Sequence, residues 1–228
     1  MYVVAHDAEA AAAEIDRAAA HPQIVQVFLP LVTDTEYGDP RYRPIFEAAI
    51  RNDLVVSFHH GSYTRSQLGW DGFPRYFIQW HNTAQIQAAQ NQLTSLVCNG
   101  VFDRYPDLKA VFLEAGVSWV TPFIWRFDQQ YRELRSEIPW VKRLPSEHIR
   151  DHVRFATQPM ADLTTAHFQQ LIEMGGTEQL FMFSSDYPHY DADSPDVVLP
   201  RTLPEELRRR IRYQNALETY PRLAGLAP

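Results

Sequence analysis

The chain has 228 residues, of which 45% are apolar and 21% charged, and its formal net charge is −7 with a pI of about 5.7. This composition excludes a disordered or fibrous class, and the length suits a single domain over residues 1–228. The acidic balance and the lack of a Lys/Arg block argue against a nucleic-acid backbone or an anionic membrane as a partner. We therefore expect a small-molecule ligand.

Cysteine content and hydropathy limit the kinds of metal site and the cellular location that the protein can have. Cys98 is the only cysteine, which excludes an internal disulfide and a thiolate cluster for structural zinc. Any metal ion would therefore be bound by histidine and carboxylate side chains. Residues 1–5 are too short for the apolar region of a secretory signal, and no apolar run reaches the ~18 residues of a membrane span. We expect a cytoplasmic protein.

Strands and helices are predicted to alternate along the whole chain. In chain order the periodicity predicts helix 8–20, strand 24–29, helix 41–52, strand 54–58, helix 83–99, strand 109–113, helix 117–135, strand 153–157, helix 164–174, strand 179–183 and helix 204–220. Asp7 is the expected N-cap of the first helix, and Gly100 the expected end of the third. Pro122 predicts an interruption of helix 117–135. Pro204 suits the first turn of the last helix.

This alternation is typical of a parallel sheet with helices outside it. Five strands are predicted, and residues 1–5 could form a sixth strand, whereas a closed TIM-type (β/α)8 barrel needs eight. The fold class that follows is α/β with a parallel sheet, and the predicted strands are too few to close a TIM-type barrel.

Polar residues follow three of the predicted strands, where active sites of parallel α/β folds lie. Strand 54–58 leads into His59 and His60, strand 109–113 into Glu114, and strand 179–183 into Asp186. Imidazole nitrogens and carboxylate oxygens suit Zn, Mn or Fe. Each residue also has a structural alternative: a satisfied buried histidine, a helix cap or a structural ion pair.

Longer motifs resemble one known family. Residues 184–189 read Ser-Ser-Asp-Tyr-Pro-His, which resembles the Ser-Asp-Tyr-Pro-His element at the last strand of the amidohydrolase-2 family of metal-dependent hydrolases and aromatic-acid decarboxylases. The resemblance extends in unbroken order from about residue 7 to residue 223. Its other segments are residues 100–109, 114–119, 125–128 and the pair Asn215-Ala216.

The resemblance implies roles for particular residues. His59 and Asp186 correspond to metal ligands, and Asp186 and Glu114 to catalytic groups. His60, His189 and Trp125 are expected to contact the substrate. The expected cofactor is a divalent ion, zinc foremost, with Mn or Fe as alternatives.

One part of the family pattern has no counterpart, so the resemblance implies an amidohydrolase-like TIM-type (β/α)8 barrel that is incomplete at its N-terminal side. Relatives carry a His-x-His pair, or an equivalent with an acidic residue, on their first strand, and no such pair precedes His59; His6 and His21 have the wrong spacing. Two protein ligands are fewer than the roughly three of a catalytic zinc site. We therefore expect weak metal binding.

The resemblance implies a metal-dependent hydrolase or decarboxylase acting on a small aromatic or cyclic carboxylate or carbonyl compound, and the sequence does not choose between the two reactions. The alternative is a truncated or non-catalytic remnant that acts through subunit association, because a sheet with an open edge favours pairing, most simply in a homodimer. A third possibility is an unrelated barrel enzyme that binds phosphate, but the sequence lacks the glycine-rich loop that such an enzyme would need.

One stretch of the sequence is rich in aromatic residues and suits either a lid over the substrate or a packed surface contact. These residues are Tyr63, Trp70, Phe73, Tyr76, Phe77 and Trp80.

Overall fold

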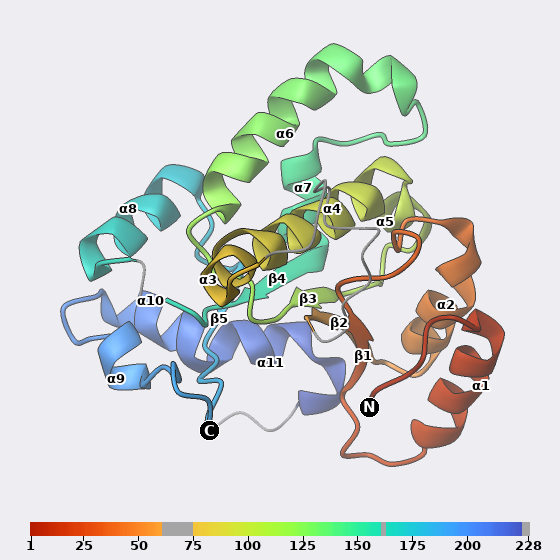
Figure 1. Ribbon diagram of the computed structural model, residues 1–228, viewed down its shortest axis with the longest axis horizontal. Coiled ribbons are helices and arrows are strands. Elements are labelled where there is room, and N and C mark those ends of the chain that lie inside the picture. The colour runs from red at the N-terminus through yellow and green to blue at the C-terminus, as the bar shows by residue number, and fades with distance from the viewer. Residues whose placement is uncertain (61–74, 161–162, 225–228) are drawn as a thin grey trace.

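Five strands form one parallel sheet whose spatial order follows the chain, β1-β2-β3-β4-β5. The structure is a computed structural model that describes residues 1–60, 75–160 and 163–224. The strands are β1 Gln26–Pro30, β2 Val55–His59, β3 Ala110–Phe112, β4 Val153–Ala156 and β5 Phe181–Met182. Parallel strands joined in chain order through helices are the arrangement of a (β/α)8 barrel, which is incomplete here (Figure 1).

Helices precede, connect and follow these strands. The longer ones are α1 Ala8–Ala18, α2 Arg43–Arg51, α4 Gln85–Cys98, α6 Val120–Leu134, α7 Pro145–His152 and α8 Thr165–Gly175. The shorter ones are α3 Phe77–Gln79, α5 Val101–Arg104, α9 Pro195–Val198, α10 Glu205–Arg209 and α11 Asn215–Thr219. Two π-helical turns, Trp80–Ala84 and Arg210–Gln214, join α3 to α4 and α10 to α11. None of the described helices is long and apolar enough to cross a membrane.

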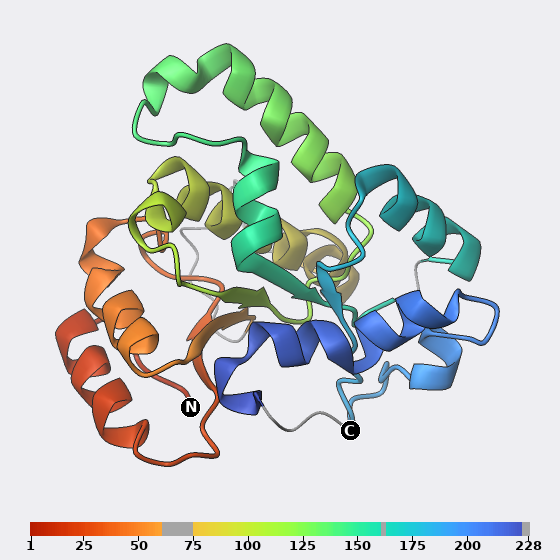
Figure 2. The same ribbon diagram turned by 180° about the vertical axis from the view of Figure 1, so that it is seen from behind.

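The two faces of the sheet have different partners, because successive strand residues point to opposite sides. Inward-facing Val55, Val111 and Met182 form a small cluster that packs against Ala216 and Tyr220 near the C-terminus. In Figure 2 the blue C-terminal helices lie on one side of the strands and the green helices on the other. Outward-facing side chains belong to the main core with the other helices: Val27, Leu29, Val56, Phe58, Phe112 and Phe155.

Hydrogen bonds attach the C-terminal helices to the edge strand β5. The backbone N–H of Phe183 donates to the carbonyl of Ile211 at 2.8 Å, and Asn215 Nδ2 donates to the carbonyl of Phe181 at 2.7 Å. At the other edge, Tyr220 donates to Gln26 Oε1 at 2.8 Å. The chain's own C-terminal segment therefore covers part of the open side from which subunit association was expected. Homodimer formation remains a prediction.

The observed elements follow the predicted order, with three differences. The strand expected over residues 1–5 is a single parallel bridge between Tyr2 and Phe28. Helices α3, α5, α7 and α9 have no counterpart among the predicted elements. The interruption expected at Pro122 is wrong, because α6 begins at Val120 and places this proline in the first turn, where N–H groups need no helical partner.

Candidate metal-binding and catalytic site

The polar residues after β2, β3 and β5 meet at the carboxyl edge of the sheet. His59 ends β2 and His60 follows it, Glu114 follows β3, and Asp186 follows β5. Their strands run parallel, so the three strand ends lie on the same edge. The predicted convergence of His59, Glu114 and Asp186 is present in the structure.

Glu114 lies between the two histidines. His59 Nε2 is 2.6 Å from Glu114 Oε2, and His60 Nε2 is 2.6 Å from Glu114 Oε1. The carboxylate side chain is 10% exposed. Although these distances define ion pairs, His60 Nε2 and Glu114 Oε2 are buried without a hydrogen-bond partner in hydrogen-bonding geometry. Buried polar atoms of this kind call for an ion or water to satisfy them.

The tautomer of His59 can be read from its contacts. Its Nδ1 faces the backbone carbonyl of His60. Since a carbonyl only accepts, Nδ1 carries the proton and Nε2 points toward Glu114. Metal-binding histidines commonly hold one nitrogen to a backbone carbonyl and present the other to the ion. His59 Nε2 would be available to a metal ion that takes the place of its contact with Glu114.

Electrostatics favour a charged Glu114. Burial raises the pKa of this carboxyl, but the contacts with His59 and His60 outweigh burial and lower the pKa to about 2. For His59, burial lowers the imidazole pKa, and the contact with Glu114, the His60 carbonyl and the charge of Asp186 together raise it above its usual value. The cluster therefore holds an anionic carboxylate that attracts positive charge.

Asp186 and His189 form the second part of the site. His189 Nδ1 lies 2.6 Å from Asp186 Oδ2. Donor atoms of Glu114, Asp186 and His189 all lie within 4.8 Å of one another, as do those of His59, His60 and Glu114. In the described part of the chain, no such group joins His59 to Asp186. The metal ligands expected from the resemblance are thus linked through Glu114.

Both site carboxylates have a strained backbone. Among the described residues, only Asp53, Glu114 and Asp186 are non-glycine residues with positive φ, at 54°, 53° and 56°. The left-handed conformation costs such a residue roughly 1–3 kcal/mol and occurs often at functional sites. Two of these three residues belong to the candidate site, which is typical of carboxylates positioned for function.

These donors fit a divalent cation. Imidazole nitrogens and carboxylate oxygens at one strand edge are the set that Zn, Mn and Fe accept. Donors on opposite sides of one ion, each about 2.1 Å from it, are about 4.2 Å apart. The donor atoms of each group lie within 4.8 Å of one another, so each group is compact enough to surround one ion. His59, His60, Glu114, Asp186 and His189 are the residues that would hold the metal.

The aromatic residues expected near the substrate divide into four sets. The Trp80 ring meets the His60 ring edge-on at 5.0 Å, so this aromatic residue borders the site. Tyr76 and Phe77 are exposed. Trp125 lies on α6 with 45% of its surface exposed, and its contact with substrate stays a prediction. Tyr63, Trp70 and Phe73 lie outside the described residues.

Gln158 and the pair formed by His81 and Asp191 were not among the predicted site residues. Gln158 follows β4, is 1% exposed, and its Oε1 has no hydrogen-bond partner. Its Nε2 lies 3.5 Å from Asp191 Oδ2, and His81 Nε2 lies 3.7 Å from the same oxygen. The strand-end rule that selected His59 would also have selected Gln158.

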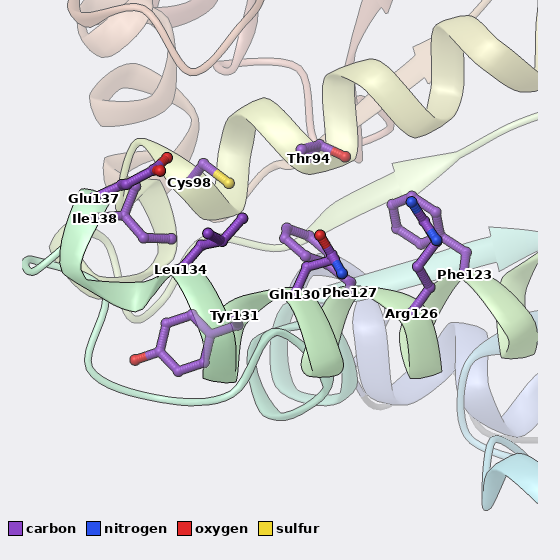
Figure 3. A pocket seen from close by; sticks show the side chains of 10 residues that line it. All are labelled: Thr94, Cys98, Phe123, Arg126, Phe127, Gln130, Tyr131, Leu134, Glu137 and Ile138. Carbon is purple, nitrogen blue, oxygen red and sulfur yellow. The ribbon is translucent and has the colours of Figure 1, made fainter.

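An apolar groove lies elsewhere, between α4 and α6 (Figure 3). Its volume is about 290 Å³, and its lining includes none of the clustered histidines and carboxylates. The lining residues are Thr94, Cys98, Phe123, Arg126, Phe127, Gln130, Tyr131, Leu134, Glu137 and Ile138. This groove is separate from the candidate site.

Comparison with models of known families identifies one family. A family model described as Amidohydrolase matches residues 1–222. No curated protein sequence matches the chain. The solved structure of 5-carboxyvanillate decarboxylase from Sphingomonas paucimobilis is similar, with a TM-score of 0.79 and 25% identity over 96% of this chain and 65% of that chain.

Two other solved structures show the same fold. An amidohydrolase from Mycobacterium avium subsp. paratuberculosis has a TM-score of 0.76 and 24% identity over 96% of this chain and 56% of its own. A dihydroxybenzoic acid decarboxylase from Polaromonas sp., solved with bound manganese and the inhibitor 2-nitroresorcinol, has a TM-score of 0.69 and 18% identity over 94% and 66%. The chain spans 56% to 66% of the length of these three proteins.

Proposed function

Because the chain belongs to the amidohydrolase-2 family, we propose that it is a metal-dependent enzyme that decarboxylates a small aromatic carboxylate. Hydrolysis of a cyclic carbonyl compound is the other reaction open to the same residues. Decarboxylation is preferred because solved structures similar to this chain include decarboxylases of carboxyvanillate and dihydroxybenzoic acid.

One observation carries the proposal. Glu114 and Asp186 are both held at positive φ, and both lie within 4.8 Å of imidazole nitrogens at the carboxyl edge of the sheet. A structural ion pair needs no strained backbone, whereas a site that fixes charged groups for chemistry often stores such strain. This arrangement supports catalysis at the metal-binding edge.

The residues have distinct roles in this proposal. When bound, a divalent ion supplies positive charge that orients a substrate carboxylate or activates a water molecule. Asp186 delivers a proton to the ring carbon as the bond to the carboxylate breaks, leaving carbon dioxide and the protonated ring. His189, 2.6 Å away, orients the Asp186 carboxyl. In hydrolysis the same carboxylate would accept a proton from water.

The test is turnover of aromatic carboxylates by the chain loaded with Mn²⁺ or Zn²⁺. Dihydroxybenzoates and 5-carboxyvanillate are suitable substrates, with release of carbon dioxide as the readout and a simple lactone as the hydrolysis probe. Asp186→Asn should lower kcat by at least about 10²-fold, as expected for loss of a general acid. Asp107→Asn, a change at an exposed carboxylate, should leave kcat unchanged. Wild-type turnover of none of these compounds would overturn the proposal.

A further inference from the structure

A polar cavity of about 620 Å³ lies where α2, the end of α4 and α5 meet the segment between α6 and α7. Among the described residues, its lining includes Arg43, Arg104 and Trp140, and none of the histidines and carboxylates of the candidate metal site. We propose that this cavity binds a small organic phosphate that carries an aromatic ring, such as a nucleotide. This ligand is separate from the substrate of the proposed function.

Two arginines bring positive charge to this cavity. Within the described part of the chain, the side chains of half-buried Arg43 and exposed Arg104 make no ion pair or hydrogen bond. Burial is the main reason that the pKa of Tyr105 rises to about 12; the contact with Glu47 raises it further, while the charges of Arg104 and Arg43 oppose the rise. Both guanidinium groups therefore lie near the same phenol. Two neighbouring guanidinium groups suit a phosphoryl group, whose charge is about −1.5 to −2 at pH 7.

Two carboxylates near these arginines have other partners. Asp103 also lines the cavity, but its Oδ2 is 3.2 Å from His148 Nε2, and its Oδ1 accepts a hydrogen bond from the backbone N–H of Lys142. Glu47 Oε1 accepts a hydrogen bond from the Tyr105 hydroxyl at 2.7 Å. The two guanidinium groups are therefore left to pair with an anion from solution.

Trp140 adds a flat apolar surface to the same cavity. Its Nε1 donates a hydrogen bond to the carbonyl of Cys98 at 2.7 Å. Gly100, with φ at 67°, approaches the indole so closely that a Cβ there would lie 2.8 Å from Trp140 Cδ1. The indole is thus held in place, yet Trp140 is 50% exposed. A ring that is already fixed loses little conformational entropy when an aromatic ligand stacks on it.

The test is isothermal titration calorimetry of the full chain with ADP, adenosine and inorganic phosphate. We expect ADP to bind more tightly than the other two, because it alone engages both the arginines and Trp140. Arg43→Gln and Arg104→Gln should each raise the ADP Kd by at least about 10-fold, as expected for loss of a charge-assisted hydrogen bond. Trp140→Leu should raise it by about 5- to 150-fold, the range for stacking of a base on an aromatic side chain.

Two control variants locate the binding. Arg201→Gln, at an exposed arginine outside the cavity, and His59→Asn, at the candidate metal site, should both keep the wild-type ADP Kd. Circular dichroism identifies any variant that fails to fold, and Arg104→Gln changes an exposed side chain, so it tests the cavity even if Trp140→Leu does not fold.

Several results would contradict the proposal. Absence of ADP binding by the wild-type chain at millimolar concentration would overturn it, as would an unchanged ADP Kd in both arginine variants. Equal Kd values for ADP and inorganic phosphate would overturn the aromatic ring as part of the ligand. Loss of ADP binding in His59→Asn with the fold intact would place ADP at the metal-binding edge instead of this cavity.

Discussion

Asn215 joins the C-terminal helix to the last strand by donating a hydrogen bond from Nδ2 to the carbonyl of Phe181, 2.7 Å away. The same Nδ2 donates to the carbonyl of Glu178 at 2.8 Å. Asn215 is fully buried, so no water can replace these bonds. The residue holds α11 against the inward face of a sheet that spans only part of a barrel.

Replacing Asn215 should therefore destabilise the fold. Asn215→Ala removes the donor from two carbonyls, and each buried polar group left unsatisfied costs about 1–3 kcal/mol, so the free energy of unfolding should fall by about 2–6 kcal/mol. Urea denaturation measures this change. Asn91→Ala, at an exposed position of α4, should change it by less than about 0.5 kcal/mol. Similar small effects of both variants would show that the attachment of α11 contributes little.

The sequence predicts the strand ends of this fold better than its helix placement. His59, Glu114 and Asp186 could be located because apolar runs end directly before them and parallel strands share one carboxyl edge. The packing of residues 204–220 on the inward face of the sheet could not be predicted from the sequence. An amphipathic pattern shows which side of a helix is buried, but not which element covers that side. The same limit applies to Glu114, whose place between two histidines depends on side-chain rotamers.

Metal binding should stabilise the folded chain. An ion that binds only the native state at about 100 times its Kd adds about 2.7 kcal/mol, so Mn²⁺ should raise the melting temperature in differential scanning fluorimetry. His59→Asn should reduce this shift because His59 Nε2 faces Glu114. His167→Asn, at an exposed histidine on α8, should preserve it. Equal shifts in wild type and His59→Asn would mean that Mn²⁺ binds elsewhere.

Trp80 should act on metal affinity through His60. The two rings meet at 5.0 Å and 80°, and His60 in turn stacks on His59 at 4.4 Å. Edge-to-face pairs contribute about 0.5–1.5 kcal/mol, so Trp80→Leu should raise the Mn²⁺ Kd by about 2- to 12-fold. Isothermal titration calorimetry measures this. Trp140→Leu, at a half-exposed tryptophan, is the matched control, and equal Kd values for both variants would contradict the contact's role.

Stability should also depend on pH through His152. This residue is 4% exposed, its ring stacks on Phe102 at 4.7 Å, and its Nδ1 lies 2.9 Å from the carbonyl of Leu108. Burial is the main reason that its pKa is lowered; Lys109 and His148 lower it further, while the Leu108 carbonyl and Asp151 oppose the shift. The folded state therefore favours the neutral imidazole.

The sign of the effect follows from that lowered pKa. Above the unfolded value of about 6.5, His152 is neutral in both states and imposes no penalty. As pH falls below about 6.5, the unfolded chain binds a proton that the folded chain resists, and stability declines until the folded pKa is reached, by at most about 1.4 kcal/mol per pH unit. His152→Gln should be less stable at pH 8, because the stacking is lost, yet decline less steeply between pH 7 and pH 5. Part of the slope should remain, since burial also lowers the pKa of His148.

Urea denaturation at each pH measures how the free energy of unfolding changes with pH, with His167→Gln as the exposed control. Equal slopes for wild type and His152→Gln between pH 7 and pH 5 would show that His152 does not cause the loss of stability at low pH.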